Sequence, residues 1–192
     1  RITGKIDEFS PNSKKVHIDI DPSSINKIIK VDLAIVGDVT SVISKINKTI
    51  SKRKNGHSKS NKSNIAKWWE RIEKWREKDS LNFVNSDESI KPQHAVQRLY
   101  ELTKNKDTYV TTEVGQHQMW AAQHYKFNKP NRWMTSGGLG TMGYGLPAAV
   151  GVQIAHPDKL VVDIAGEASV LMTMQEMSTA VQYNLPIKIF IL

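Results

Sequence analysis

The spacing of apolar residues near the end of the chain predicts a strand, a helix and a second strand. Residues 161–164 are apolar at three of four positions, which is typical of a buried strand. Beyond them, apolar residues recur at helical spacing on one face, at Val170, Met174, Met177 and Val181. We expect Ser169 to cap this helix, and Asn184 with Pro186 to end it before a strand at residues 187–192.

An acidic residue, Glu167, follows Gly166 in the turn between that strand and that helix. Glycine permits a tight turn that brings the backbone close to a ligand. A carboxylate next to the free N–H groups of a helix N-terminus suits a magnesium ion that carries a diphosphate. A simpler interpretation stays open, because many acids in such turns only cap the helix.

A second candidate segment is the glycine cluster SGGLGTMGYGLP at residues 136–147, in which Pro147 is well placed to start a helix. Before it, residues 108–114 predict a strand that runs into the polar and aromatic stretch EVGQHQMW at residues 113–120. Ligands bind at the carboxyl ends of strands in open parallel sheets. From residue 108 onward, the order strand, helix, glycine loop, helix, strand, helix and strand predicts an α/β fold with doubly wound parallel sheets.

The first fifty residues carry acidic side chains at the ends of two further predicted strands. These strands are residues 16–20 and 33–36, and a helix is expected at residues 41–50. Asp19 and Asp38 therefore lie where nucleotide-binding folds accept hydrogen bonds from ribose hydroxyls. A plain helix cap at Asp38 is an equally open interpretation.

The middle of the chain reads as an exposed linker followed by an amphipathic helix. Residues 51–64 are polar and basic. The predicted helix, residues 65–78, places its large apolar side chains on one broad face, at Ile65, Trp68, Trp69, Ile72 and Trp75. We expect the tryptophans to pack the linker onto the body of the protein. The chain therefore divides into residues 1–50, residues 51–88 and residues 89–192.

The formal net charge of +8 raises the question of nucleic acid or an anionic membrane, with Lys52, Arg53 and Lys54 as a dense basic run. The other lysines are dispersed, and no helix-turn-helix, zinc or RNA-recognition pattern occurs. We therefore expect no nucleic acid and no membrane as partner, with a basic interaction module at residues 52–78 as the weaker alternative. Cysteine is absent, which fits a reducing compartment, and the six histidines show no metal-ligand spacing.

The motifs together resemble those of the thiamine diphosphate enzymes, and within them the family of acetolactate synthase (acetohydroxyacid synthase) large catalytic subunits. The resemblance is carried by residues 113–120, by residues 136–147 and by Gln175 with Glu176, and it covers residues 1–50 and 89–192. It implies the end of a Rossmann-like, FAD-binding middle domain at residues 1–50. It also implies the N-terminal part of a thiamine diphosphate-binding domain at residues 89–192.

The resemblance implies that two of these segments bind thiamine diphosphate. Gln116 and His117 resemble the residues that contact the diphosphate. Gly140 and Thr141 resemble the loop against the cofactor's pyrimidine, and Met142 resembles the large apolar residue that keeps the cofactor bent. Without the resemblance, Met142 is typical of ordinary core packing, and His117 of an interior histidine satisfied by a backbone carbonyl.

The third segment of the implied site departs from the family's pattern. The family's motif begins Gly-Asp-Gly, whereas this chain has Gly166, Glu167 and Ala168. Glu167 is the implied Mg²⁺ ligand, with a side chain one methylene longer than the usual aspartate. Ala168 and Ser169 would offer backbone N–H or hydroxyl groups to phosphate oxygens. The two asparagines that end the family's motif would fall just beyond Leu192, so we expect an internal fragment.

In the middle domain, Asp19 with Ile20 and Asp38 with Val39 resemble the pairs that contact the adenosine of FAD. FAD has no redox duty in the acetolactate reaction as this family runs it. An FAD site would therefore not make the protein an oxidoreductase.

The resemblance implies a parent enzyme that decarboxylates pyruvate on thiamine diphosphate and condenses the hydroxyethyl unit with pyruvate or 2-oxobutyrate. This is the first common step in the synthesis of valine, leucine and isoleucine. It further implies a homodimer or homotetramer, a small regulatory subunit as partner and a bacterial cytoplasmic location. The glutamate that activates the pyrimidine belongs to a domain outside this chain, so we expect no catalytic residue within it and no activity from the segment alone.

Two alternatives remain open. Another thiamine diphosphate-dependent carboligase, decarboxylase or oxidase would share the fold and the cofactor motif, because these do not fix the acceptor substrate. A decayed nucleotide-binding or regulatory protein would explain the departures at Glu167 and Ala168.

Overall fold

The computed structural model describes residues 3–52 and 59–192, with only the backbone described at residues 59–63. The chain forms two compact units, Arg1–Lys78 and Asp79–Leu192, and each is described by itself. The described residues of the first unit form the 3₁₀ helices η1 (Ile6–Glu8) and η2 (Pro22–Ser24), the strands β1 (Val16–Asp19) and β2 (Leu33–Val36), and the helices α1 (Val39–Lys52) and α2 (Lys59–Arg76).

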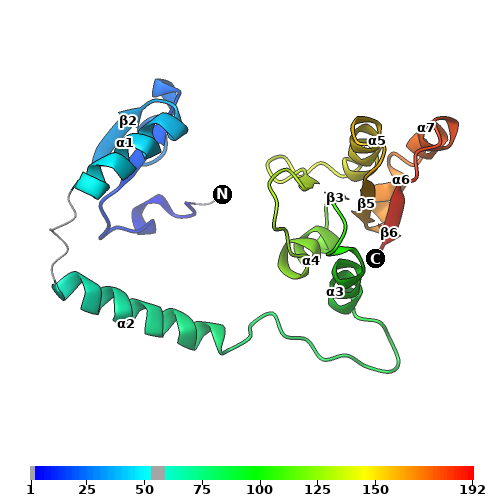
Figure 1. Cartoon of the computed structure of the whole chain (residues 1–192), viewed down its shortest axis with the longest axis horizontal. Helices are drawn as coiled ribbons and strands as arrows, with labels where there is room; N and C mark the ends of the chain where they lie inside the picture. Colours follow the sequence, from blue (N-terminus) through cyan, green and yellow to red (C-terminus); the bar gives the residue numbers. More distant parts are fainter. Residues whose placement is uncertain (1–2, 53–58) are drawn as a thin grey trace. The chain divides into compact units, whose positions relative to one another are not determined.

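Strands β1 and β2 pair in parallel, with Asp19 opposite Val36, so both strands end at the same edge (Figure 1). Strand β2 confirms the prediction at residues 33–36, and β1 ends one residue earlier than expected. Helix α1 begins at Val39, two residues before the expected start. The cause is a cap, because Asp38 Oδ1 accepts the N–H of Ser41 at 3.0 Å. Where side chains are described in this unit, none is fully buried.

The expected linker is partly helical. Its residues 51–52 end α1 and its residues 59–64 begin α2, whereas residues 53–58, including Arg53 and Lys54 of the basic run, lie outside the described residues. None of the helices in residues 3–52 and 59–192 combines the length and the hydropathy that a membrane span requires.

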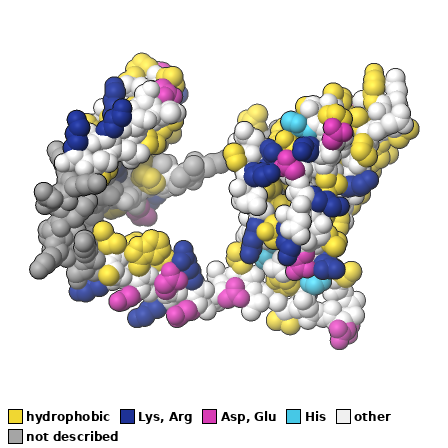
Figure 2. All heavy atoms as spheres, viewed as in Figure 1, with side chains coloured by type: hydrophobic (Ala, Val, Ile, Leu, Met, Phe, Trp, Pro, Cys, Tyr) yellow, Lys and Arg dark blue, Asp and Glu magenta, His cyan; other side chains and the backbone are white. Residues whose placement is uncertain are grey.

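Helix α2 gathers apolar side chains on one side and charged side chains on the other (Figure 2). Trp68, Trp69 and Trp75 are 52%, 51% and 47% exposed. Trp68 and Trp75 meet edge to face with ring centroids 5.6 Å apart, and the guanidinium of Arg71 lies 5.8 and 5.0 Å from those two centroids. The expected packing of these tryptophans onto the body of the protein stays a prediction. Within α2, the rings are covered in part by one another and by a cation.

The second unit is a sheet of four parallel strands in the order β4-β3-β5-β6, with helices on both faces (Figure 1). This arrangement confirms the predicted α/β fold with a parallel sheet. The unit's elements, in chain order, are α3 (Pro92–Thr103), β3 (Thr108–Thr112), α4 (Gln116–His124), β4 (Trp133–Thr135), α5 (Gly145–Ala155), β5 (Leu160–Ala165), α6 (Glu167–Leu171), α7 (Glu176–Gln182) and β6 (Lys188–Ile191).

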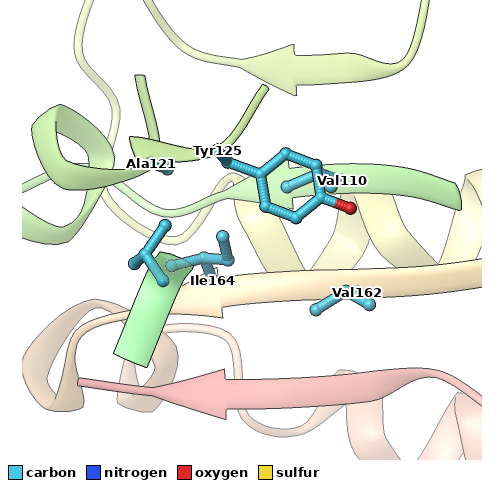
Figure 3. Close-up of a cluster of buried hydrophobic side chains, with 6 residues drawn as sticks. Val110, Ala121, Tyr125, Val162 and Ile164 are labelled. Atoms are coloured by element: carbon cyan, nitrogen blue, oxygen red, sulfur yellow. The ribbon is translucent and has the colours of Figure 1, made fainter. Parts of the chain in front are cut away.

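One face of this sheet packs against α3 and α4. Figure 3 shows the cluster that they enclose, in which Val110, Val162 and Ile164 of the strands meet Ala121 and Tyr125. All five are at most 6% exposed. Burying one such large side chain stabilises a fold by about 1.5–3 kcal/mol. The two central strands are therefore fixed in place from this side.

The opposite face packs against α5 and α6. Tyr109 and Val161 meet Ala149 of α5, while Leu146 meets Ala165 and Val170 in a third cluster. Neighbouring strand residues point to opposite faces, so Val161 and Val162 contribute to different clusters. Strand β5 is thus covered on both sides, as the apolar run in the sequence predicts.

The prediction of one continuous helix after β5 is wrong, because the structure has two helices there, α6 and α7. A Cβ on Gly143 would lie 3.0 Å from Thr173 Cγ2 and 3.3 Å from Met172 Cβ, so the glycine loop occupies the side of the chain where α6 ends. Of the four residues expected on one helical face, Val170 and Met177 pack inward, whereas Met174 and Val181 are 51% and 77% exposed.

Ser169 does not cap this helix, contrary to the prediction. The N-cap of α6 is Gly166, and Ser169 lies inside the helix, where its hydroxyl donates to the carbonyl of Gly166 at 3.2 Å. The turn at Gly166 is tight enough to start the helix without a side-chain cap.

Candidate functional site

Three segments of the second unit meet at the carboxyl ends of β3 and β5. These strands pair in parallel with Thr112 opposite Ile164, so the residues that follow them leave the sheet at the same edge. The glycine loop lies against both. A Cβ on Gly140 would lie 3.9 Å from Val114 Cγ1 after β3, and Gly143 packs against Thr173 after α6. The three segments therefore form a single candidate site.

Glu113 attaches the glycine loop to the end of β3. Its carboxylate is fully buried and accepts the N–H of Gly143 at 2.7 Å and the N–H of Leu146 at 3.0 Å, one on each oxygen. Its own N–H donates to the carbonyl of Ile164 at 3.0 Å. Hydrogen bonds to a charged acceptor are stronger than neutral ones. This role of Glu113 was not predicted from the sequence, although an acid at the end of an apolar strand is a signal for one.

His117 joins the segment after β3 to the segment after β5. Its ring fills the space that a Cβ would need at Gly115 and at Gly166, where hypothetical Cβ atoms would come within 2.8 Å of Cε1 and 2.7 Å of Nδ1. Only glycine therefore fits these two positions with the histidine in place. The imidazole is 6% exposed, and its Nε2 has no hydrogen-bond partner among the described residues.

Burial lowers the pKa of His117, opposed by the main chain of Glu113 and by the charges of Glu113 and Glu167. The ring is therefore neutral at pH 7. The simpler interpretation, an interior histidine satisfied by a backbone carbonyl, accounts for one ring nitrogen and leaves Nε2 unexplained.

Glu167 is the first residue of α6, with an exposed side chain in the first turn. The N-cap of that helix is Gly166, which has no side chain, and the charge of Glu167 in the first turn also suits the helix dipole. Ala168 and Ser169 follow in the same turn, where backbone N–H groups have no acceptor within the helix. Ser169 is 1% exposed and its hydroxyl is engaged by Gly166, which leaves its backbone N–H for a ligand.

The remaining implied residues lie on the open side of the site. Gln116 is the exposed first residue of α4, and Met142 is 39% exposed, so Met142 is not a core residue. Gly140 has φ +72°, a conformation that other residues adopt with strain. The N–H of Thr141 donates to Ser136 Oγ at 3.0 Å, which orders the loop.

The implied FAD residues lie in the first unit, at the carboxyl edge of β1 and β2. The parallel pairing brings Asp19 with Ile20 close to Asp38 with Val39, and the N–H of Gly37 donates to the carbonyl of Asp19 at 2.8 Å. Ile20 and Val39 are 73% and 54% exposed. Asp38 also caps α1, so one of its oxygens is engaged and the cap interpretation is confirmed.

Two protein-family profiles match the chain. Residues 113–192 match the profile described as "Thiamine pyrophosphate enzyme, C-terminal TPP binding domain", and residues 1–46 match "Thiamine pyrophosphate enzyme, central domain". The chain belongs to the thiamine pyrophosphate enzymes. The first of these matches begins at Glu113 and spans all three segments of the candidate site.

Named relatives are similar to this chain over nearly its whole length. It is 46% identical over 187 residues to the acetolactate synthase isozyme 3 large subunit of Escherichia coli K12, covering 97% of the chain and 32% of that protein. It is 43% identical over 192 residues to the acetolactate synthase large subunit of Haemophilus influenzae, covering 100% of the chain and 33% of that protein. For the acetolactate synthase large subunit of Porphyra purpurea, the identity is 46% over 192 residues, covering 100% and 31%. The chain spans about a third of the length of these curated relatives.

A buried acid behind the candidate site, Asp163, was not predicted from the sequence. Asp163 of β5 is fully buried and accepts the hydroxyl of Thr111 at 2.9 Å, while its other oxygen has no partner among the described residues. Burial raises the pKa of Asp163 to about 7, the neighbouring charge of Glu113 adds to the rise, and the Thr111 hydrogen bond opposes it. The signal in the sequence was an acid inside the apolar run of residues 161–165.

Proposed function

We propose that this chain is part of an acetolactate synthase large subunit, and that its second unit supplies the diphosphate- and magnesium-binding half of a thiamine diphosphate site. The observation that carries the proposal is the contact of the His117 ring with Gly166. That contact joins the end of β3 to the turn that bears Glu167, so the groups suited to a diphosphate and to its metal ion lie together.

The residues present fit the cofactor's diphosphate. The buried Nε2 of His117 lacks a partner among the described residues, and a buried polar atom of this kind calls for one. A Cβ on Gly137 would meet no atom within 4 Å, so there is open space beside the loop at this position. Helix α4 adds the positive end of its dipole beside Gln116.

Glu167 suits a magnesium ion whose coordination shell is completed by phosphate oxygens. The described residues contain no cluster of three His, Cys, Asp or Glu side chains that could hold a metal by themselves. Magnesium commonly takes one or two carboxylates and completes its shell with phosphate oxygens and water. The exposed Glu167 supplies one such carboxylate next to the N–H groups of Ala168 and Ser169.

Bound thiamine diphosphate would supply the carbon acid and the electron sink for decarboxylation. The chain's own residues would bind and orient it. Gln116 and His117 would hold the diphosphate, and His117, being neutral, would do so by hydrogen bonding. Gly140 and Thr141 would lie against the pyrimidine, with Met142 as the apolar support of the bent cofactor. Glu113 would act indirectly: its carboxylate accepts N–H groups of the loop that carries these three residues and so fixes that loop.

For the first unit we propose a segment of an FAD site, with FAD bound as a structural group. Asp19 and Asp38 supply carboxylates at one sheet edge, which suits ribose hydroxyls. We further propose that the whole protein is a homodimer or homotetramer with a small regulatory subunit, and that a cytoplasmic location applies. The sequence similarity to proteins named large subunits supports the small-subunit proposal.

A product assay tests the proposed reaction. A full-length subunit that contains this sequence would be incubated with pyruvate, thiamine diphosphate and Mg²⁺, with and without 2-oxobutyrate, and the products would be identified. We expect acetolactate, and acetohydroxybutyrate when 2-oxobutyrate is added. Acetaldehyde or an acetyl product alone would instead indicate a decarboxylase or an oxidase on the same scaffold.

A further inference from the structure

A second hollow lies at the opposite edge of the four-stranded sheet, where the strands begin. It is a cavity of about 300 Å³ formed by the end of α3, the start of β3 and the segment between α4 and β4. Ligand sites in proteins begin at about this volume. The candidate cofactor site lies at the carboxyl ends of the same strands, so the two places are separated by the length of the sheet.

The lining of this hollow is strongly basic. It contains Lys104, Lys106, Lys126, Lys129 and Arg132 but only one carboxylate, Asp107. The topology produces this concentration, because cations precede three adjacent parallel strands. Lys106 lies two residues before β3, Arg132 directly before β4, and Lys159 directly before β5.

Asp107 already forms ion pairs with three cationic side chains. It receives Arg132 Nε at 2.9 Å, Lys129 Nζ at 3.3 Å and Lys159 Nζ at 3.4 Å. The hydrogen bond from Arg132 is the main reason that the pKa of Asp107 lies well below its ordinary value, so this carboxylate is ionised throughout the physiological range. The remaining lysines of the lining, Lys104, Lys106 and Lys126, form no ion pair in the part of the chain that the structure describes.

The back of the hollow is ordered before any ligand arrives. The guanidinium of Arg132 lies 4.2 Å from the ring centroid of Tyr109, and it also donates to Asp107 and to main-chain carbonyls. The hydroxyls of Tyr125 and Thr103 are hydrogen-bonded at 2.6 Å, and Phe127 packs against Tyr125 with ring centroids 4.9 Å apart. Arg132 is thus a positioning residue, and the charges left for a ligand are those of the exposed lysines Lys104, Lys106 and Lys126.

We infer that this cavity binds a phosphorylated small molecule, with the ammonium groups of Lys104, Lys106 and Lys126 as the phosphate contacts. Lysine binds phosphate as a point charge, and several lysines around one hollow suit a group that carries more than one negative charge. The aromatic side chains of Tyr100 and Phe127 offer apolar surface to the organic part of such a ligand. Carboxylate ligands fit less well, because one negative charge would leave most of the lysines uncompensated.

Calorimetric titration with ADP and with inorganic pyrophosphate tests this inference. A full-length subunit that contains this sequence is first saturated with thiamine diphosphate, Mg²⁺ and FAD, so that neither the candidate cofactor site nor the proposed FAD segment contributes to the binding. We expect saturable binding that weakens as salt is added. Equal affinity for the two ligands means that the phosphates alone are recognised, whereas tighter binding of ADP means that the aromatic wall contributes.

The variants distinguish this site from general attraction of anions to a basic protein. The double variant Lys104→Gln/Lys126→Gln should weaken binding at least about tenfold, since each charged contact that is lost is worth about that factor. Lys91→Gln is the matched control, because Lys91 is exposed and precedes α3, about 18 Å along the helix from its other end. Circular dichroism would verify that the variants are folded. The absence of saturable binding, or equal weakening by Lys91→Gln, would overturn the inference.

Discussion

Asp163→Asn should stabilise the protein at neutral and alkaline pH. Asp163 is fully buried, receives one hydrogen bond from Thr111, and has a pKa of about 7 against an ordinary value of 3.8. Burial of the charged form is the main cause. Asparagine has the same shape as protonated aspartic acid and keeps the acceptor for Thr111, so it mimics the neutral form without the charge.

The sign of the effect follows from proton binding. Between pH 3.8 and about 7, the folded protein keeps a proton on Asp163 that the unfolded chain has released. The stabilising contribution of the neutral acid is therefore complete below pH 3.8 and is lost as the pH rises to about 7. Over this interval the shift corresponds to a fall of about 4 kcal/mol in the free energy of unfolding. The asparagine variant lacks this fall, so its advantage at pH 8 approaches the same amount.

Urea denaturation at a series of pH values from 4 to 8 measures this difference. The control is Asp158→Asn, which removes an exposed carboxylate just before β5 and leaves the core unchanged. We expect the curves of the control and the unmodified protein to run parallel, while the Asp163→Asn curve diverges upward as the pH rises. An Asp163→Asn variant that is no more stable than the unmodified protein at pH 8 would refute the reasoning.

Two further changes test the framework that holds the glycine loop. Glu113→Gln leaves one amide oxygen for two N–H donors, so we expect the free energy of unfolding to fall by about 1–3 kcal/mol and amide hydrogen exchange at Gly143 or Leu146 to accelerate. Unchanged exchange at both amides would contradict the assigned hydrogen bonds. Gly145→Ala places a Cβ 2.7 Å from the backbone nitrogen of Glu113 and should lower the free energy of unfolding by about 1–3 kcal/mol or more. Gly151→Ala is the matched control in the same helix: its Cβ meets no atom within 4 Å, so this variant should raise the free energy of unfolding by about 0.5–1 kcal/mol. Thermal melts in which the two alanine variants behave alike would argue against this packing.

The strands were the most predictable part of the fold, because their apolar runs are local. β2 has the predicted bounds, and β5 extends the predicted run by one residue at each end. β4 was not predicted, since it has three residues and depends on pairing with β3, including the 2.6 Å contact between the hydroxyls of Thr112 and Thr135. At the break between α6 and α7, Gly143 approaches Thr173, a residue far from it in the sequence, so a local pattern does not reveal this contact.

The candidate site, too, could be predicted from the sequence only in part. His117 and Glu167 could be placed in one site from the sequence, because the carboxyl ends of parallel strands share an edge. The roles of Glu113 and Asp163 could not, because both arise from burial under α5, which the sequence does not reveal residue by residue. The predicted capping role of Ser169 was wrong because only Gly166 separates the end of β5 from the start of α6, so Ser169 already lies inside the helix.

The most direct test of the proposed site is the affinity for thiamine diphosphate as a function of free Mg²⁺, measured by calorimetry. The measurement is made on the unmodified protein and on the variants Glu167→Ala, Glu167→Asp and Glu101→Ala. Glu101→Ala is the control, because this exposed glutamate lies on α3 and pairs with Arg98. We predict that Mg²⁺ strengthens binding in the unmodified protein, in Glu167→Asp and in the control, and that Glu167→Ala loses at least about tenfold of that gain. Binding that is independent of Mg²⁺, or an equal response to Mg²⁺ in Glu167→Ala, would contradict the assignment of Glu167 as the metal ligand.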